Sequence, residues 1–349
     1  MDGLPHERFE RVLSSVQGQP LVVLLAGHPD PDAIGSALAH RRIGERLGVP
    51  VTVACVHPLA HRENRALVKL LGIEMTQIAD ANDLKRFKHL SLVDTQRPDP
   101  TLDLPADLNL LTVVDHHGPP AVDAPFVDVR PTIGASCSIY AQYLQHGLAP
   151  LGSARDDRRL ATALFFGIQT DTDDFTLASA DDFAAAAYVR PLCDLDVLKR
   201  VGRRAVSAVA MDVISRCLNN LQVVRDFAVA GAGEVAAADR DAIGAAADFL
   251  LRREDIDTAI VFGVVGDRID GSLRTNNPSI DPQWLLETAF GRDAAGRPYG
   301  GGRADKGGFQ IPLGIVADGS DRKALWALVQ QVVRSRLARV VPELSEVRG

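Results

Sequence analysis

A short segment in the first half of the chain ends in three residues that can do metal or acid–base chemistry. Residues 111–114 are mostly apolar and β-prone, and Asp115, His116 and His117 follow them directly, before a glycine and two prolines. A run of this kind that ends in turn residues is typical of a buried strand. A carboxylate and two imidazoles at such a point can bind a cation or move a proton. The segment therefore predicts a functional site where the strand ends.

Two other predicted strands also lead into carboxylates. Residues 21–26 are continuously apolar and precede Asp30 and Asp32, and residues 90–93 precede Asp94. The carboxyl ends of parallel strands meet at one edge of an open α/β sheet, where sites are built. A turn or a helix N-cap would explain any one of these carboxylates by itself. Three such strand ends together favour one shared site.

A fourth acidic group lies after an apolar segment that includes Phe165, Phe166 and Ile168. We expect a helix over residues 156–167, with Asp171 presented just beyond it. Taken alone, Asp171 fits the acidic turn that often follows a helix equally well.

Together these segments supply a set of ligands that suits two divalent cations. The set consists of Asp30, Asp32, Asp94, His116 and Asp171. Oxygen ligands with one imidazole favour Mn²⁺ or Mg²⁺ over a structural zinc. Two such ions about 3.5–4 Å apart share a bridging water, lower its pKa and neutralise the oxygens of a phosphoryl group, so we expect phosphate-ester hydrolysis. A single metal ion or a purely electrostatic pocket is the alternative.

The wider pattern predicts an α/β protein. Strand-like and helix-like segments alternate in the first half, as in a parallel sheet with crossover helices. We expect a catalytic domain over residues 1–185, a helical linker over residues 186–221 and a smaller α/β domain over residues 222–349. Within the smaller domain we expect a hairpin at residues 257–275, followed later by a glycine-rich loop at residues 300–302.

Composition and charge narrow the class of partner. Lys and Arg number 38 and Asp and Glu number 45, so the net charge is −7 and the whole molecule is not built to bind long nucleic acid. The four cysteines contain no CxxC pair, which argues against a disulfide scaffold or a zinc ribbon and fits a reducing cytoplasm. No segment has the apolar length of a signal peptide or a membrane span, so we expect neither export nor membrane insertion.

Four segments resemble, in order, the four motifs of the DHH phosphoesterase superfamily. They are residues 30–36 (DPDAIGS), 93–95 (VDT), 115–117 (DHH) and 167–172 (GIQTDT). Residues 272–275 (SLRT) and 300–302 (GGG) resemble the SLRS and GGGH motifs of the DHH-associated C-terminal domain, so the likeness covers nearly the whole chain. The resemblance implies two domains with the active site in the cleft between them.

Carried over by position, the resemblance assigns roles to the ligand set. It implies that Asp94 and Asp171 bridge two metal ions. It further implies that Asp30 binds one of these ions and that Asp32 and His116 bind the other.

Three further residues of the first domain receive roles from the resemblance. His117 would face the substrate phosphate, and Asp115 would orient an imidazole by accepting its other N–H. His28 would be a further metal ligand. Only Pro29 separates His28 from Asp30, whereas the family usually has three residues between its histidine and the first aspartate.

In the second domain, the resemblance implies that a set of residues binds the substrate: Arg274, Gly300, Gly301, Gly302 and Arg303. Arg274 would contact phosphate, and the glycines would let backbone N–H groups approach an anion closely. The glycine motif of the family ends in histidine, where this chain has Arg303. A guanidinium can also bind phosphate, through two parallel hydrogen bonds.

These features predict a phosphohydrolase that uses two divalent cations, Mn²⁺ first and Mg²⁺ second, on a small nucleotide or a short oligonucleotide. It is most similar to the DHH subgroup that degrades very short oligonucleotides and dephosphorylates 3′-phosphoadenosine 5′-phosphate (pAp). Alternative enzymes are a phosphodiesterase for cyclic or linear dinucleotides, a RecJ-type single-strand exonuclease and an inorganic pyrophosphatase. A catalytically weak nucleotide-binding regulator is an alternative from another class. A homodimer is a further expectation.

Overall fold

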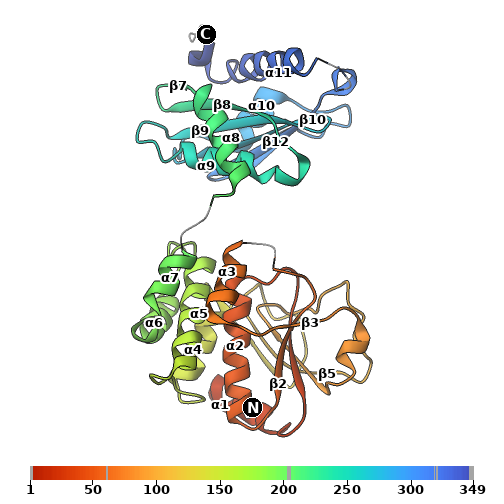
Figure 1. Cartoon of the computed structure of the whole chain (residues 1–349), viewed down its shortest axis with the longest axis vertical. Coiled ribbons are helices and arrows are strands. Elements are labelled where there is room, and N and C mark those ends of the chain that lie inside the picture. Colours follow the sequence, from red (N-terminus) through yellow and green to blue (C-terminus); the bar gives the residue numbers. More distant parts are fainter. Residues whose placement is uncertain (1–2, 60–61, 203–205, 318, 320, 346–349) are drawn as a thin grey trace. The chain divides into compact units, whose positions relative to one another are not determined.

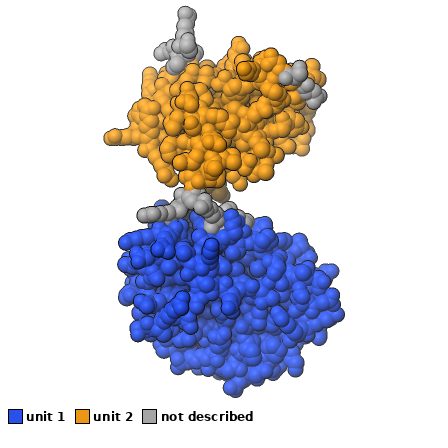
Figure 2. All heavy atoms as spheres, viewed as in Figure 1, with its two compact units in different colours: residues 1–205 blue, residues 206–349 orange. Residues whose placement is uncertain are grey.

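The chain divides into two compact units, each with its own hydrophobic core (Figure 2). The first unit is Met1–Ala205 and the second is Val206–Gly349. Our computed structural model describes residues 3–59, 62–202, 206–317, 319 and 321–345 (Figure 1). None of the helices in these ranges is both long and apolar enough to cross a membrane.

Where the structure describes it, the segment 186–221, which we expected to link the two domains, is mostly helical, and it is shared between the units. Val189 and Val201 pack in the core of the first unit. Val213 and Cys217 pack in a core of the second unit. The division of the chain therefore falls after residue 205, within the segment that we had assigned to a linker.

The first unit is built on a six-stranded sheet in which all neighbouring strands are parallel, as predicted. Its strands are β1 (Leu21–Leu25), β2 (Val51–Cys55), β3 (Thr76–Gln77), β4 (His89–Val93), β5 (Asn109–Asp115) and β6 (Phe126–Val129). β1 is buried along its whole length, as its continuous apolar sequence predicts for a strand covered on both faces. The order β3-β2-β1-β4-β5-β6 reverses direction between β1 and β4. Open α/β sheets bind ligands beside the carboxyl ends of strands at such a switch point.

Helices of the first unit accompany this sheet (Figure 1). They are α1 (Pro5–Ser14), α2 (Pro31–Arg46), α3 (Arg62–Leu71), α4 (Ser136–Gln145), α5 (Arg155–Asp171), α6 (Ala180–Val189) and α7 (Leu195–Val201), with short 3₁₀ turns at Ala81–Leu84 and Arg190–Leu192. α2 begins where it does because the carboxylate of Asp30 accepts the N–H of Ala33 at 2.9 Å and Pro31 fits the first helical position.

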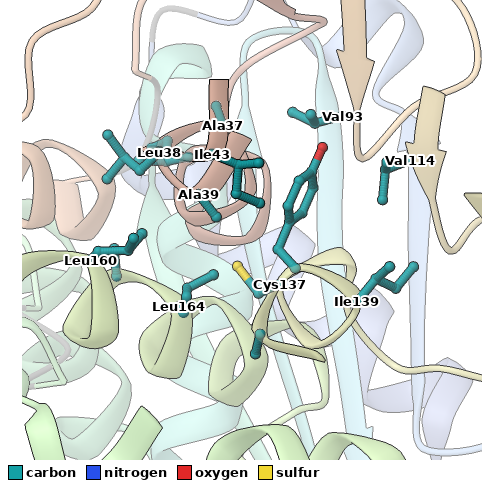
Figure 3. Close-up of a cluster of buried hydrophobic side chains, with 14 of the residues drawn as sticks. Ala37, Leu38, Ala39, Ile43, Val93, Val114, Cys137, Ile139, Leu160 and Leu164 are labelled. Atoms are coloured by element: carbon teal, nitrogen blue, oxygen red, sulfur yellow. The ribbon is translucent and has the colours of Figure 1, made fainter. Parts of the chain in front are cut away.

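α2 packs against α4 and α5 through small residues (Figure 3). A Cβ atom on Gly35 or on Gly167 would lie 2.6 Å from Sγ of Cys137, so only glycine fits at these two crossings. A Cβ on Gly167 would also lie 3.1 Å from Cα of Asp32. The glycines thus bring the last turns of α5 against the first turn of α2.

The end of α5 differs from our expectation. We predicted a helix that ends near residue 167 and an acidic turn after it, but the helix continues to Asp171. Ala163 and Gly167 lie on the face of α5 that contacts α2, and Asp171 lies four residues further on, on the same face. Close packing along this face keeps the helix regular and points Asp171 toward the start of α2.

The second unit contains a mixed six-stranded sheet in the order β11-β12-β10-β9-β8-β7. Its strands are β7 (Gln222–Val224), β8 (Phe227–Glu234), β9 (Thr258–Val265), β10 (Arg268–Thr275), β11 (Gly300–Arg303) and β12 (Lys306–Pro312). One face packs against α8 (Ala208–Asn219) and α9 (Asp241–Leu250), and the other against α10 (Pro282–Phe290) and α11 (Arg322–Leu337). Short 3₁₀ turns lie at Ala237–Asp239, Gly314–Val316 and Pro342–Ser345. The α/β character of this unit is as predicted.

The predicted hairpin is present as β9 and β10, which turn at Gly266 with a φ of 60°. The predicted glycine-rich loop at residues 300–302 is wrong, because these residues form the edge strand β11 and pair with β12. α10 approaches this strand so closely that a Cβ on Gly300 would lie 3.0 Å from Cβ of Leu286. The glycines therefore allow a helix to pack on the strand.

Candidate metal centre

The predicted strand ends meet at one edge of the first sheet, at its switch point. β1, β4 and β5 are neighbours, and they lead into Asp30, Asp94 and Asp115 respectively. Asp94 has a φ of 59°, a left-handed conformation that is uncommon for a residue with a side chain. Its N–H still donates to the carbonyl of Val114 at 2.9 Å, so this pairing with β5 holds the unusual backbone. Such strain in an otherwise regular sheet is common at functional sites.

Asp32, in the first turn of α2, is completely buried, and its carboxylate meets the start of α4. One carboxylate oxygen accepts the N–H of Cys137 and the other accepts the N–H of Ser136, both at 2.7 Å. Burial raises the pKa of Asp32 well above its ordinary value, and the nearby carboxylates Asp94 and Asp171 raise it further. The N-terminus of α4 thus holds the carboxylate in place while leaving its other lone pairs for a cation.

His116 lies between two carboxylates with one ring nitrogen unsatisfied. Its Nε2 is 3.0 Å from Oδ2 of Asp171 and 3.4 Å from Oδ1 of Asp94. Neither oxygen is aligned for a hydrogen bond, so the buried Nε2 has no hydrogen-bond partner in the described part of the chain. Nδ1 lies 3.2 Å from the carbonyl of Ile133, and a proton on Nδ1 leaves the Nε2 lone pair free for a metal ion.

The charges around His116 also point to a cation. Burial lowers the pKa of His116, but its contacts with Asp171 and Asp94 outweigh burial and raise this pKa to about 11. Burial and the proximity of Asp94 raise the pKa of Asp30 to about 6. Carboxylates that are buried and mutually repulsive hold protons, unless a divalent cation takes the place of those protons.

His117 is presented differently from His116. Its Nδ1 is 2.9 Å from Oδ1 of the buried Asp115 and 3.7 Å from Oδ1 of Asp94, while its side chain is 63% exposed. Asp115 therefore orients His117, as a carboxylate beside an imidazole was expected to do. The other oxygen of Asp115 is buried with no hydrogen-bond partner in the described ranges.

Two groups of residues have ligand atoms close enough to hold a metal ion. They are Asp94, His116 and His117, and Asp32, His116 and Asp171, with all ligand atoms of each group within 4.8 Å of one another. The carboxylates and imidazoles fit Mn²⁺ or Mg²⁺. These groups contain Asp32, Asp94, His116 and Asp171 of the predicted ligand set, together with His117, whereas Asp30 belongs to neither group.

His28 is in neither of these groups. It is exposed, and its Nδ1 is 2.9 Å from the carbonyl of Pro58. Its ring centroid is 5.2 Å from that of His57. His61 lies outside the described residues.

Asp99 is a residue of this region that the sequence analysis missed. It is buried, it accepts the N–H of Gly27 at 2.9 Å, and it lies 3.0 Å from Nε2 of His57. Burial raises the pKa of Asp99, but hydrogen bonds from Thr101 and Gly27 lower it to about 2. Asp99 is therefore charged, and its hydrogen bond from Gly27 holds the loop after β1 in place. The signal for it in the sequence was the spacing of Asp99 and Thr101, which is typical of an Asx turn.

In the second unit, two of the predicted arginines share one face of the sheet with a lysine. Arg274 is paired with Lys306 across β10 and β12, and Lys306 is paired with Arg303 across β12 and β11. Residues directly opposite one another in antiparallel strands lie on the same face, so three positive side chains stand in a row. Arg274 donates to Asp248 at 2.6 Å and to the hydroxyl of Ser272 at 2.7 Å.

Two curated proteins are similar to most of this chain. An uncharacterized protein from Methanocaldococcus jannaschii is 38% identical over 326 residues, which cover 92% of this chain and 64% of that protein. The cyclic-di-AMP phosphodiesterase PdeA of Listeria monocytogenes is 26% identical over 314 residues, which cover 82% of this chain and 47% of that protein. The chain therefore spans less than two thirds of the length of these curated relatives.

A solved structure shares the fold. The exopolyphosphatase-related protein from Bacteroides fragilis matches with a TM-score of 0.61 and 17% identity, over 97% of both chains. Residues 22–168 match the model of the DHH family, N-terminal domain, a range that includes β4, β5, all of β1 but its first residue, and every candidate ligand except Asp171. The first unit is therefore similar to the DHH family, N-terminal domain.

Proposed function

We propose that this protein is a metal-dependent phosphohydrolase that cleaves phosphate esters of small nucleotides. The observation that carries the proposal is the pair of ligand groups that share His116 at the switch point of the first sheet. An imidazole nitrogen binds one ion only, so Asp94 and Asp171, one from each group, are the carboxylates that a pair of closely spaced cations would share. A regulator that only binds nucleotide would have no need of such a centre.

The candidate site residues of the first unit have different roles in the proposed reaction. Asp32 and His116 would hold one cation, Asp30 would hold the other, and Asp94 and Asp171 would serve as ligands for both. When bound, the cations lower the pKa of a water molecule and neutralise charge on the phosphoryl oxygens. Asp32 is held by the N-terminus of α4, so its position is fixed before any ligand arrives.

His117 contacts the phosphoryl group of the substrate. Its Nδ1 is held by Asp115, which sets the orientation of the ring and leaves Nε2 directed away from that carboxylate. From this position His117 can donate a hydrogen bond, or a proton, to a phosphate oxygen. Its proximity to Asp94 places this donor beside the candidate metal ligands.

The second unit acts as a DHH-associated domain that binds the remainder of the nucleotide. The row of Arg274, Lys306 and Arg303 supports this assignment, because adjacent cations on one face suit a phosphate group. Gly300, Gly301 and Gly302 belong to β11, at the same edge of the sheet. The ion pair of Arg274 with Asp248 keeps that guanidinium in place until a phosphate competes for it.

Short substrates fit the net charge of −7, which would repel a long nucleic acid. We propose oligonucleotides of a few residues and pAp as substrates, with Mn²⁺ as the first choice of cation. A cyclic dinucleotide is the second candidate, because the Listeria relative is named a cyclic-di-AMP phosphodiesterase and is similar to 82% of this chain. We place the enzyme in the cytoplasm, since its four cysteines are all free thiols.

An assay of the purified protein with Mn²⁺ tests the proposal. The panel consists of pAp, a 5′-phosphorylated dinucleotide, a cyclic dinucleotide, a 24-mer and pyrophosphate. We expect the dinucleotide and pAp to be hydrolysed faster than the 24-mer. A preference for the cyclic substrate would favour the second candidate, and no hydrolysis of any member would refute the proposal.

A further inference from the structure

Beside the candidate metal centre, the first unit contains a pocket that is lined partly by residues without a role in the description above. Its volume is about 410 Å³. One wall is the segment 94–97, and the other is formed by Asp115, His117 and Ala121. Asp94 and His117 therefore border both the pocket and a candidate metal site. A group bound in this pocket would lie against the residues that hold the metal.

The side chain of Gln96 connects the two walls of the pocket through hydrogen bonds. Its amide nitrogen donates to the carbonyl of His117 at 2.6 Å and to that of Pro119 at 3.3 Å. Its amide oxygen accepts the N–H of Ala121 at 2.6 Å. An amide is needed for this arrangement, since it has both a donor and an acceptor. The pocket is thus a fixed feature of the unit.

Arg97 is the arginine that lines this pocket. It is exposed, and its guanidinium forms no ion pair with any residue that the structure describes. Its backbone is held by Thr95, whose hydroxyl donates to the carbonyl of Arg97 at 3.0 Å. Other arginines of the unit, such as Arg42 and Arg130, are paired with carboxylates. An unpaired guanidinium in a fixed pocket is suited to an anion that arrives from solution.

We propose that this pocket binds the phosphoryl group that is cleaved, and that Arg97 contacts it together with His117. The inference rests on the proposed function and extends it to a phosphate-binding residue that the sequence motifs do not contain. Arg97 supplies a permanent positive charge, while the ring of His117 supplies a single N–H donor. The two donors approach the phosphoryl group from the two walls that Gln96 joins.

The test is the binding of inorganic phosphate, the expected product, to the Mn²⁺-loaded full-length protein by isothermal titration calorimetry. Removal of a charge-assisted contact weakens phosphate binding by about ten- to a hundredfold, which is the loss we expect for Arg97→Ala. Arg97→Lys should recover part of the affinity, because it keeps the charge but loses the planar fork. Both variants should bind Mn²⁺ as the wild type does.

Arg46→Ala is the matched control. Arg46 is exposed in the same unit, and it lies at the opposite end of α2 from Asp30, about 22 Å along the helix. This variant changes the net charge equally and should bind phosphate normally. Wild-type affinity in Arg97→Ala, an equal loss in Arg46→Ala, or no phosphate binding by the wild type would overturn the inference. Phosphate binding that depends on Arg97, together with no hydrolysis of any ester, would refute the proposed function and leave the phosphate site standing.

Discussion

Proton release on metal binding gives a quantitative prediction for the candidate centre. In the metal-free protein at pH 7, His116 carries a proton, because its contacts with Asp171 and Asp94 raise its pKa to about 11. A metal ion at Nε2 must displace a proton from the ring. Asp30, with a pKa of about 6, adds about half a proton at pH 6 and almost none at pH 8. The raised pKa of Asp32 also increases the number of protons released on metal binding.

The size of the effect follows from these pKa values. Mn²⁺ binding should release at least one proton throughout the range from pH 6 to pH 8. For each proton released, the affinity for Mn²⁺ rises about tenfold per unit increase in pH, which is about 1.4 kcal/mol of binding free energy. We therefore expect Mn²⁺ to bind at least about a hundredfold more tightly at pH 8 than at pH 6.

Calorimetric titration in buffers with different heats of ionisation measures the number of protons directly. His116→Gln should release about one proton fewer than the wild type at pH 8, and His146→Gln should release the same number. His146 is a suitable control because it is exposed at the end of α4 in the same unit. If the wild type releases no proton at pH 8, or if His116→Gln releases as many as the wild type, then His116 is not the ligand we describe.

Three further predictions concern other residues. His28→Ala should reduce Mn²⁺ affinity and turnover less than His116→Ala, because His28 is exposed and belongs to neither ligand group; the reverse order would show that His28 is a ligand. Arg303→Ala should lower kcat/KM about ten- to a hundredfold, chiefly by raising KM, with partial recovery in Arg303→Lys, and unchanged kinetics would remove Arg303 from the substrate site. Burial lowers the pKa of His40 from 6.5 to about 3. Below pH 6.5, a proton therefore binds His40 in the unfolded chain but not in the folded one. The free energy of unfolding should fall by up to about 5 kcal/mol as the pH falls toward 3. Urea unfolding of metal-free protein at pH 7, 5 and 4 should show a smaller loss for His40→Gln, and equal losses in both proteins would contradict this assignment.

The sequence predicted the positions of the strands well, because parallel strands buried on both faces have continuous apolar sequences. β1, β4 and β5 were recognised in this way, and candidate ligands follow their carboxyl ends. Their adjacency in the sheet was an inference from fold rules, and the structure confirms it.

Contacts between distant segments could not be predicted from one sequence. The two hydrogen bonds to Asp32 come from residues more than 100 positions away, and no local pattern signals them. No local pattern marks Gln96, yet its side chain joins residues 117–121 to the segment after β4. The glycines at residues 300–302 were read as a loop because their role in packing against α10 depends on tertiary structure.

The most direct test of the central claim is the rate of dinucleotide hydrolysis as Mn²⁺ is added to metal-free protein. We expect no hydrolysis before Mn²⁺ is added and a full rate only when two equivalents per chain are bound. Asp171→Ala should show neither tight binding of two ions nor turnover, since Asp171 belongs to a ligand group and contacts the shared His116. A full rate in the metal-free protein, or a full rate at one equivalent of Mn²⁺, would contradict a two-cation phosphohydrolase.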